Sequence, residues 1–158
     1  MTRVPVTVGL MPSMLDRLID PESAGTENRR GYGIEKMVQV VRRDLEDLLN
    51  TRASALGSVA EYPELMNSVY TFGMPDFTSK TMYNAMQRKA LGSIVEETVE
   101  KYEPRLKEVH ALLVDEDAGE ARHIKFELFA RLRVEPSPEV GFETVLELTT
   151  GHASVGAK

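Results

Sequence analysis

The chain contains neither cysteine nor tryptophan, and these absences disfavour several classes of protein. Without cysteine there is no disulfide, no thiolate nucleophile and no cysteine ligand for a metal. Aromatic residues make up only 6% of the 158 residues, so few rings are available to stack on sugars. No stretch approaches the roughly 18 apolar residues that a membrane-spanning helix requires. We therefore expect neither a disulfide scaffold nor insertion into a membrane.

The chain also lacks a basic surplus. Its formal net charge is -6, which disfavours nucleic acid and anionic membranes as the main partner. Residues 1–15 carry no sustained apolar run before a cleavage site, so we expect no signal peptide and a cytoplasmic location. Hydrophobic residues make up 42% and charged residues 28%, which is typical of a folded domain with a substantial core.

The first two thirds of the chain are predicted to be helical. Ser13 is placed to cap a short first helix, and a polar, glycine-containing loop follows over residues 22–33. Apolar residues then recur with a helical period, so that one face of the second helix is apolar. The third helix is expected to begin after a cap at Thr78 or Ser79. The three predicted helices span residues 14–19, 34 to about 51, and about 79 to 102.

The last third of the chain changes to the period of a β-strand. Apolar and polar residues alternate from His123 to Val134, which predicts a strand with one wet face. Shorter alternating stretches precede and follow it, at 109–114 and 142–148. Consecutive strands with short links predict a three-stranded antiparallel meander. We expect a frayed tail from Gly151 onward.

These patterns predict an α+β fold, with N-terminal helices followed by the meander. The expected organisation is a short helix and flexible loop over residues 1–33, one α+β domain over 34–150, and a flexible tail over 151–158.

Arg52 lies in line with the apolar face of the second helix if that helix extends so far. It should then bind a carboxylate or exposed backbone carbonyls. Alternatively, it is a basic residue favourably placed near the negative end of the helix dipole, while Asn50 helps to end the helix.

Catalytic patterns find little support in the sequence. There is no Gly-x-Ser-x-Gly elbow, and no histidine spacing is typical of a metal site, so we expect no cofactor or metal. Glu35 and Asp44 have the spacing of a lysozyme-like pair. Nine residues along one helix place them on opposite faces and about 13 Å apart along the axis. Catalytic carboxyl groups lie roughly 5–10 Å apart across one bond, which disfavours a glycosidase.

Glu103-Pro104-Arg105 marks a corner where a helix ends and a strand begins. Proline pushes the preceding residue out of the helical region, so Glu103 ends the helix. A glutamate there faces the negative end of the dipole and should bind a cation, either within the fold or on a partner. Residues two apart in an extended segment point the same way, so Glu103 and Arg105 could present both charges on one patch. Alternatively, Glu103 is simply a surface charge that the fold tolerates beside the end of a helix.

Four segments, taken in the order in which they occur along the chain, resemble the TssE family of type VI secretion baseplate components. The most specific are the run Val41 to Arg52, which reads VRRDLEDLLNTR, and Glu103-Pro104-Arg105. The others are Leu15 to Leu18 and Tyr70 to Phe77, where Phe72-Gly73-Met74-Pro75 departs mildly from the usual version, which has Leu or Tyr followed by Gly-Leu-Pro. The resemblance covers roughly residues 13 to 150. The family is in turn similar to phage tail baseplate wedge subunits called lysozyme-related.

The resemblance implies a structural, non-enzymatic role in the baseplate wedge and a domain similar to the strand-exchanging core of contractile sheath subunits. It implies TssF and TssG as partners, contact with sheath subunits to help seed sheath assembly, and TssK as a further candidate. Glu103, Pro104 and Arg105 would dock on the wedge's helical core bundle. Arg43, Asp44, Asn50 and Arg52 are expected to contribute to partner binding. A peptidoglycan hydrolase remains the alternative.

Overall fold

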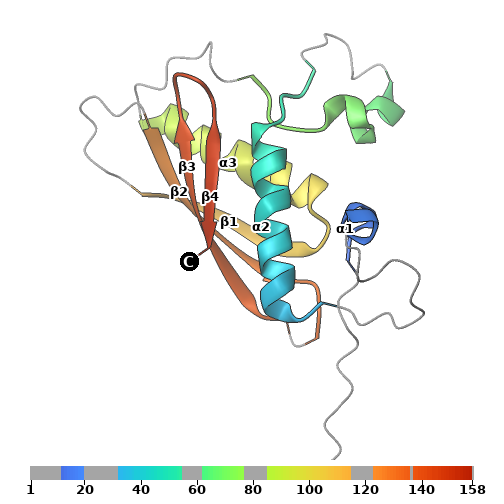
Figure 1. The fold of residues 1–158 in the computed structure, drawn as a ribbon. Coiled ribbons are helices and arrows are strands. Elements are labelled where there is room, and N and C mark those ends of the chain that lie inside the picture. The colour runs from blue at the N-terminus through green and yellow to red at the C-terminus, as the bar shows by residue number, and fades with distance from the viewer. Residues whose placement is uncertain are drawn as a thin grey trace, which may run out of the picture. The chain divides into compact units, whose positions relative to one another are not determined.

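The computed structural model of the protein describes residues 12–19, 32–54, 62–76, 85–114, 123–135 and 137–157 (Figure 1). Most of the predicted loop at 22–33 and the predicted cap at Thr78 or Ser79 lie outside these residues. The chain forms two compact units, Met1–Val40 and Val41–Lys158.

Helices precede strands, as the sequence predicts. The α-helices are α1 (Met14–Ile19), α2 (Ile34–Asn50) and α3 (Ala85–Tyr102), and two short 3-10 helices, η2 (Pro63–Asn67) and η3 (Val69–Thr71), lie between α2 and α3. The strands are β1 (Leu106–Val114), β2 (His123–Leu132), β3 (Glu139–Glu147) and β4 (Ala153–Ala157). None of the helices in the described ranges is long and apolar enough to cross a membrane.

Local sequence explains how the helices begin and end. The backbone N–H of Asp16 donates to the hydroxyl of Ser13 at 3.1 Å, which confirms Ser13 as the cap of α1. In α2, the apolar face predicted from the period is buried at Val41, Leu45 and Leu49.

The sheet has four antiparallel strands in the order β1-β2-β3-β4, so the prediction of three strands is wrong. The expected frayed tail contains β4, which pairs with β3 from Leu146↔Ala153 to Phe142↔Ala157. Gly151, with a φ of 70°, reverses the chain between them. The residues of β4 are small and show only a short alternation, so its sequence alone gives little sign of a strand.

One face of the sheet forms the core. Along β2 and β3 every second side chain is buried, and the largest are Phe126, Leu128 and Phe142. Leu49 of α2 and Val95 of α3 line a small internal cavity together with buried side chains of this face. The part of α2 from Val41 onward and α3 therefore cover the inner face of the sheet, and the alternate residues of the strands point outward.

Thr144 is the one polar side chain buried on this inner face of the described sheet. Its hydroxyl finds no hydrogen-bond partner among the residues that the structure describes, although only 2% of the residue is exposed. A buried hydroxyl without a partner carries an uncompensated desolvation cost.

We therefore expect Thr144→Val to raise the free energy of unfolding by about 1 kcal/mol, because valine keeps the shape and removes the hydroxyl. Urea titration measures this change. Thr149→Val, at an exposed position, is the matched control and should leave stability nearly unchanged. A loss of stability in Thr144→Val would show that the hydroxyl has a partner.

Candidate functional site

The corner between α3 and β1 is a tight turn. The backbone N–H of Glu103 donates to the carbonyl of Val99 at 2.8 Å, and Leu106 N–H donates to the carbonyl of Glu103 at 3.0 Å. Pro104 is the second residue of this turn, where its fixed φ suits the backbone. Pro104 is exposed, whereas Glu103 is buried with 4% of its surface accessible.

Arg105 folds back onto Glu103. Its Nε donates to Oε1 of Glu103 at 2.6 Å, and its Nη2 pairs with Oε2 of the same carboxylate. The backbone N–H of Arg105 also donates to Oε1, at 3.2 Å. Two-pronged pairs of this kind are among the stronger hydrogen bonds in proteins. The cation that Glu103 requires at the end of α3 is therefore supplied within the fold.

Asp44 on α2 accepts from the same guanidinium. Nη2 of Arg105 donates to Oδ2 of Asp44 at 2.6 Å, across 61 positions of sequence. The other oxygen, Oδ1, accepts from Nε and Nη2 of Arg43 at 3.1 and 2.7 Å. Arg43, Asp44, Glu103 and Arg105 form what we call the corner cluster, which ties α2 to the turn after α3.

The cluster balances two carboxylates against two guanidinium groups. Exposure of the side chains falls from 41% at Arg43 to 24% at Asp44 and Arg105 and 5% at Glu103. Burial alone would lower the pKa of Arg105, but the hydrogen bonds that Arg105 donates to Glu103 and Asp44, together with the negative charges of these carboxylates, outweigh burial and raise that pKa. Arg105 therefore stays a cation, and it neutralises the buried carboxylate.

A second group of side chains on or just after α2 binds the backbone around β4, which Figure 1 shows beside α2. Asn50 donates from Nδ2 to the carbonyl of Ala153 at 2.8 Å, and its Oδ1 accepts from the N–H of Ala153 at 2.9 Å. The amide thus replaces a neighbouring strand at that position. Arg42 donates to the carbonyl of Val155 at 2.8 Å, and Arg52 to that of Gly151 at 2.6 Å. We call Arg42, Asn50 and Arg52 the edge clasp.

The edge clasp settles the alternatives for Arg52 and Asn50. Arg52 binds a backbone carbonyl, which is one of the two outcomes expected from its position. Nδ2 of Asn50 also donates to the carbonyl of Glu46 at 2.8 Å, so the side chain helps to end α2 as well. Sequence reasoning missed Arg42, because its i,i+4 spacing to Glu46 is also that of an ordinary surface ion pair.

The opposite edge of the sheet carries a similar contact. Oε1 of Glu96 on α3 accepts from the backbone N–H of Ala111 in β1 at 2.6 Å. Sequence reasoning did not single out Glu96, because a glutamate on a helix is ordinarily an exposed surface residue. Helix side chains therefore occupy part of each outer strand, which reduces the number of unpaired edge groups.

The glycine in the segment from Tyr70 to Phe77, Gly73, is required because the backbone there passes close to the chain after α2. The chain after α2 pairs with Met74, whose N–H donates to the carbonyl of Thr51 at 2.8 Å. Gly73 has a φ of 107°, and a Cβ atom there would lie 2.4 Å from the same carbonyl. Only glycine fits this close approach, which holds Arg52 in place for its bond to Gly151.

The structure separates the predicted site residues into these two groups. Arg43, Asp44, Glu103 and Arg105 come together, with Pro104 exposed beside them, whereas Asn50 and Arg52 bind β4. The charges of Glu103 and Arg105 face one another, so the interpretation that both are presented outward on one patch is wrong for Glu103.

The structure gives no support to Glu35 and Asp44 as a lysozyme-like catalytic pair. Glu35 and Asp44 lie on the single helix α2, and Asp44 already accepts from two arginines. Within the described part of the chain, no group of three or more His, Cys, Asp or Glu residues could hold a metal ion.

Comparison with known proteins supplies a family. The model of the family described as baseplate wedge protein gp25 matches residues 35–137, which include the whole corner cluster. Among solved structures, a chain of "The baseplate complex from the type VI secretion system" is similar, with 21% identity and a TM-score of 0.48. The similarity covers 72% of this chain and 96% of that one. No curated protein sequence matches significantly.

Arg105→Ala should lower the free energy of unfolding by about 3 kcal/mol, because Glu103 would stay buried without its cation. Arg43→Ala is the matched control and should cost only about 0.5 kcal/mol, since Arg43 is more exposed and bonds at the rim. Denaturant titration measures both. In a double-mutant cycle, Glu103→Ala with Arg105→Ala should cost clearly less than the sum of the single changes. Additive costs would contradict direct coupling of the two side chains.

Asn50→Ala should accelerate hydrogen exchange at the N–H of Ala153 about tenfold or more, because that N–H loses its acceptor. NMR-detected exchange measures it residue by residue. Gln39→Ala removes an exposed amide from the same helix and should leave the exchange of Ala153 unchanged. Equal rates in both variants would show that Asn50 does not hold β4.

Proposed function

The chain belongs to the gp25 family of baseplate wedge proteins, and from this premise we propose that it is a structural subunit of a type VI secretion baseplate wedge. Its role in the baseplate is structural and not enzymatic. The observation that carries the proposal is the family match over residues 35–137, which contains all of α2 except Ile34 and also the corner after α3. We place the assembled subunit in the cytoplasm.

The proposed docking site for TssF and TssG is the outer side of the corner cluster. Pro104 is exposed at the tip of the turn, and Arg43 is the most exposed member of the cluster. The internal hydrogen bonds of Arg105 hold the turn in one conformation before a partner arrives. Preorganisation of this kind lowers the entropy lost on binding. Glu103, in this proposal, positions Arg105 and does not itself contact the partner.

Sheath subunits are proposed to meet the sheet. Asn50 and Arg42 already bind the outer backbone groups of Ala153 and Val155, so we propose that the strand-accepting edge is the end of β1 from Leu112 to Val114. Leu112 is 58% exposed and Val114 is 38% exposed. Exposed apolar edge strands are suited to pairing with another chain's strand. TssK is a further proposed partner, with no surface assigned to it.

The docking experiment should use changes that leave the fold intact. Arg43→Ala combined with Pro104→Ser should weaken binding to a co-purified TssF–TssG complex about tenfold, because both changes alter the exposed surface of the turn. Biolayer interferometry with the purified subunit measures the dissociation constant.

Lys89→Ala is the matched control, since it removes an exposed cation from α3. Circular dichroism must show all variants folded. Unchanged affinity in the double variant would contradict docking at the corner, and an equal loss in Lys89→Ala would indicate a general charge effect instead.

A further inference from the structure

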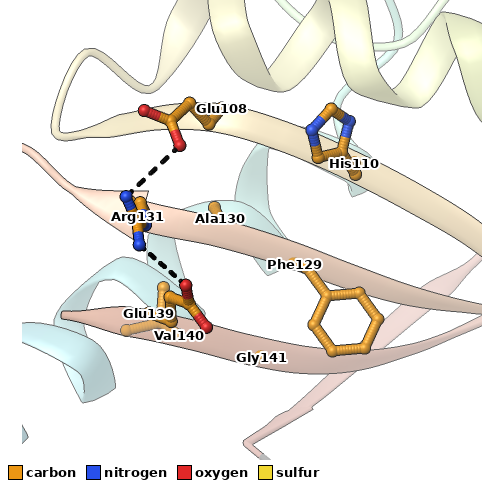
Figure 2. A pocket seen from close by; sticks show the side chains of 8 residues that line it. All are labelled: Glu108, His110, Phe129, Ala130, Arg131, Glu139, Val140 and Gly141. Carbon is orange, nitrogen blue, oxygen red and sulfur yellow. Dashed lines mark hydrogen bonds and ion pairs between the residues drawn. The ribbon is translucent and has the colours of Figure 1, made fainter.

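The outer face of the sheet carries a hollow, distinct from the corner cluster, that spans β1, β2 and β3 (Figure 2). Its volume is about 500 Å³. The inner face is buried under the helices, whereas this face keeps Phe129 36% exposed and Leu112 58% exposed. An apolar and partly aromatic surface of this kind often marks a site where another protein binds.

Two local features of the sheet create the hollow. Gly141 lies directly opposite Phe129 in the register of β2 and β3, so no β3 side chain stands directly opposite the ring. The pairing of β1 with β2 shifts between Lys107 and His110, and Glu108 within the shift has a positive φ of 53°. A non-glycine residue in that conformation is strained, and such strain concentrates at functional sites. The result is a hollow beside the Phe129 ring.

The rim of the hollow has an acidic surplus. Figure 2 shows Arg131 between two carboxylates. Its Nη1 lies 3.7 Å from Oε2 of Glu108, and its Nη2 lies 2.8 Å from Oε1 of Glu139. The side chains of Glu108 and Glu139 are 58% and 77% exposed. One guanidinium cannot neutralise both carboxylates, so a second cation would be attracted to this rim.

We propose that the hollow docks a segment of a different protein that places an apolar side chain beside Phe129 and a lysine or arginine next to Glu139. The apolar side chain would fill the space over Gly141, and the basic one would complete the pairing of the rim carboxylates. A mixed apolar and charged contact of this kind combines a buried anchor with a polar rim.

The charges select this occupant over others. A second copy of the chain, packed face to face, would bring the same surplus of carboxylates to the contact, because each copy carries Glu108 and Glu139 with only Arg131 between them. Two surfaces with the same sign of net charge disfavour association. Nucleic acid would meet the same carboxylates with its phosphates. The proposed surface uses residues on the face of the sheet away from the helices. It can therefore be tested separately from docking at the corner.

A photo-crosslinking amino acid at position 129 tests the proposal in cells that assemble the full protein with its partners. Expected is an adduct with one other protein, mapped by mass spectrometry to a segment that has a lysine or arginine within about three residues of the attachment point. Glu139→Lys should reduce the adduct about fivefold, because it reverses the rim charge. Glu97→Lys, an equal charge change at an exposed position of α3, is the matched control and should leave the adduct unchanged.

Four results would overturn the proposal: no protein adduct at position 129, an adduct with a second copy of the chain, attachment to a segment without a basic residue, or equal effects of Glu139→Lys and Glu97→Lys. A second crosslinker at Pro104 reports separately on the corner. An adduct at 104 without one at 129 would leave the proposed function standing and reject the outer-face surface.

Discussion

The guanidinium of Arg105 is shared between Glu103 and Asp44, and these two ion pairs are the constraint on which the described architecture depends. Glu103 is buried where the dipole of α3 is unfavourable to a negative charge. It tolerates that position because Arg105 bonds both of its oxygens. The third bond, to Asp44, reaches α2. One side chain therefore fixes the turn after α3 and the distance from that turn to α2.

A second constraint acts at the edges of the sheet. Asn50 completes the backbone hydrogen bonds of Ala153, and Glu96 accepts from Ala111 on the opposite outer strand. Helices that cover the inner face thus also supply polar side chains to both edges. Edge groups already bonded within the chain are not available to a strand from outside. Any strand exchange with a neighbour is therefore directed to the remaining edge positions.

Part of this arrangement was predictable from the sequence, for identifiable reasons. The apolar period of α2 and the alternation of β2 are local patterns, and the structure confirms both elements. The need of Glu103 for a cation also follows from local chemistry. The full set of partners does not follow from local chemistry. The contact between Arg105 and Asp44 depends on how α2 packs against the turn. In the same way, β4 is stabilised by Asn50, which comes from a helix distant in sequence. The few small residues of β4 therefore predict a frayed tail when they are considered alone. The hollow beside Phe129 depends on a register shift and on the pairing with Gly141, which only the folded sheet reveals.

The central claim is that Arg105 is held by its own fold in the free protein, before any partner is present. NMR of the arginine Nε–H groups tests it most directly, because Arg105 Nε donates to Glu103 at 2.6 Å. The account predicts a separate Arg105 Nε–H signal whose exchange with water is strongly slowed in the isolated subunit, and a faster exchange in Asp44→Asn. An Arg105 signal that exchanges as fast as that of an arginine in an unfolded chain would contradict it.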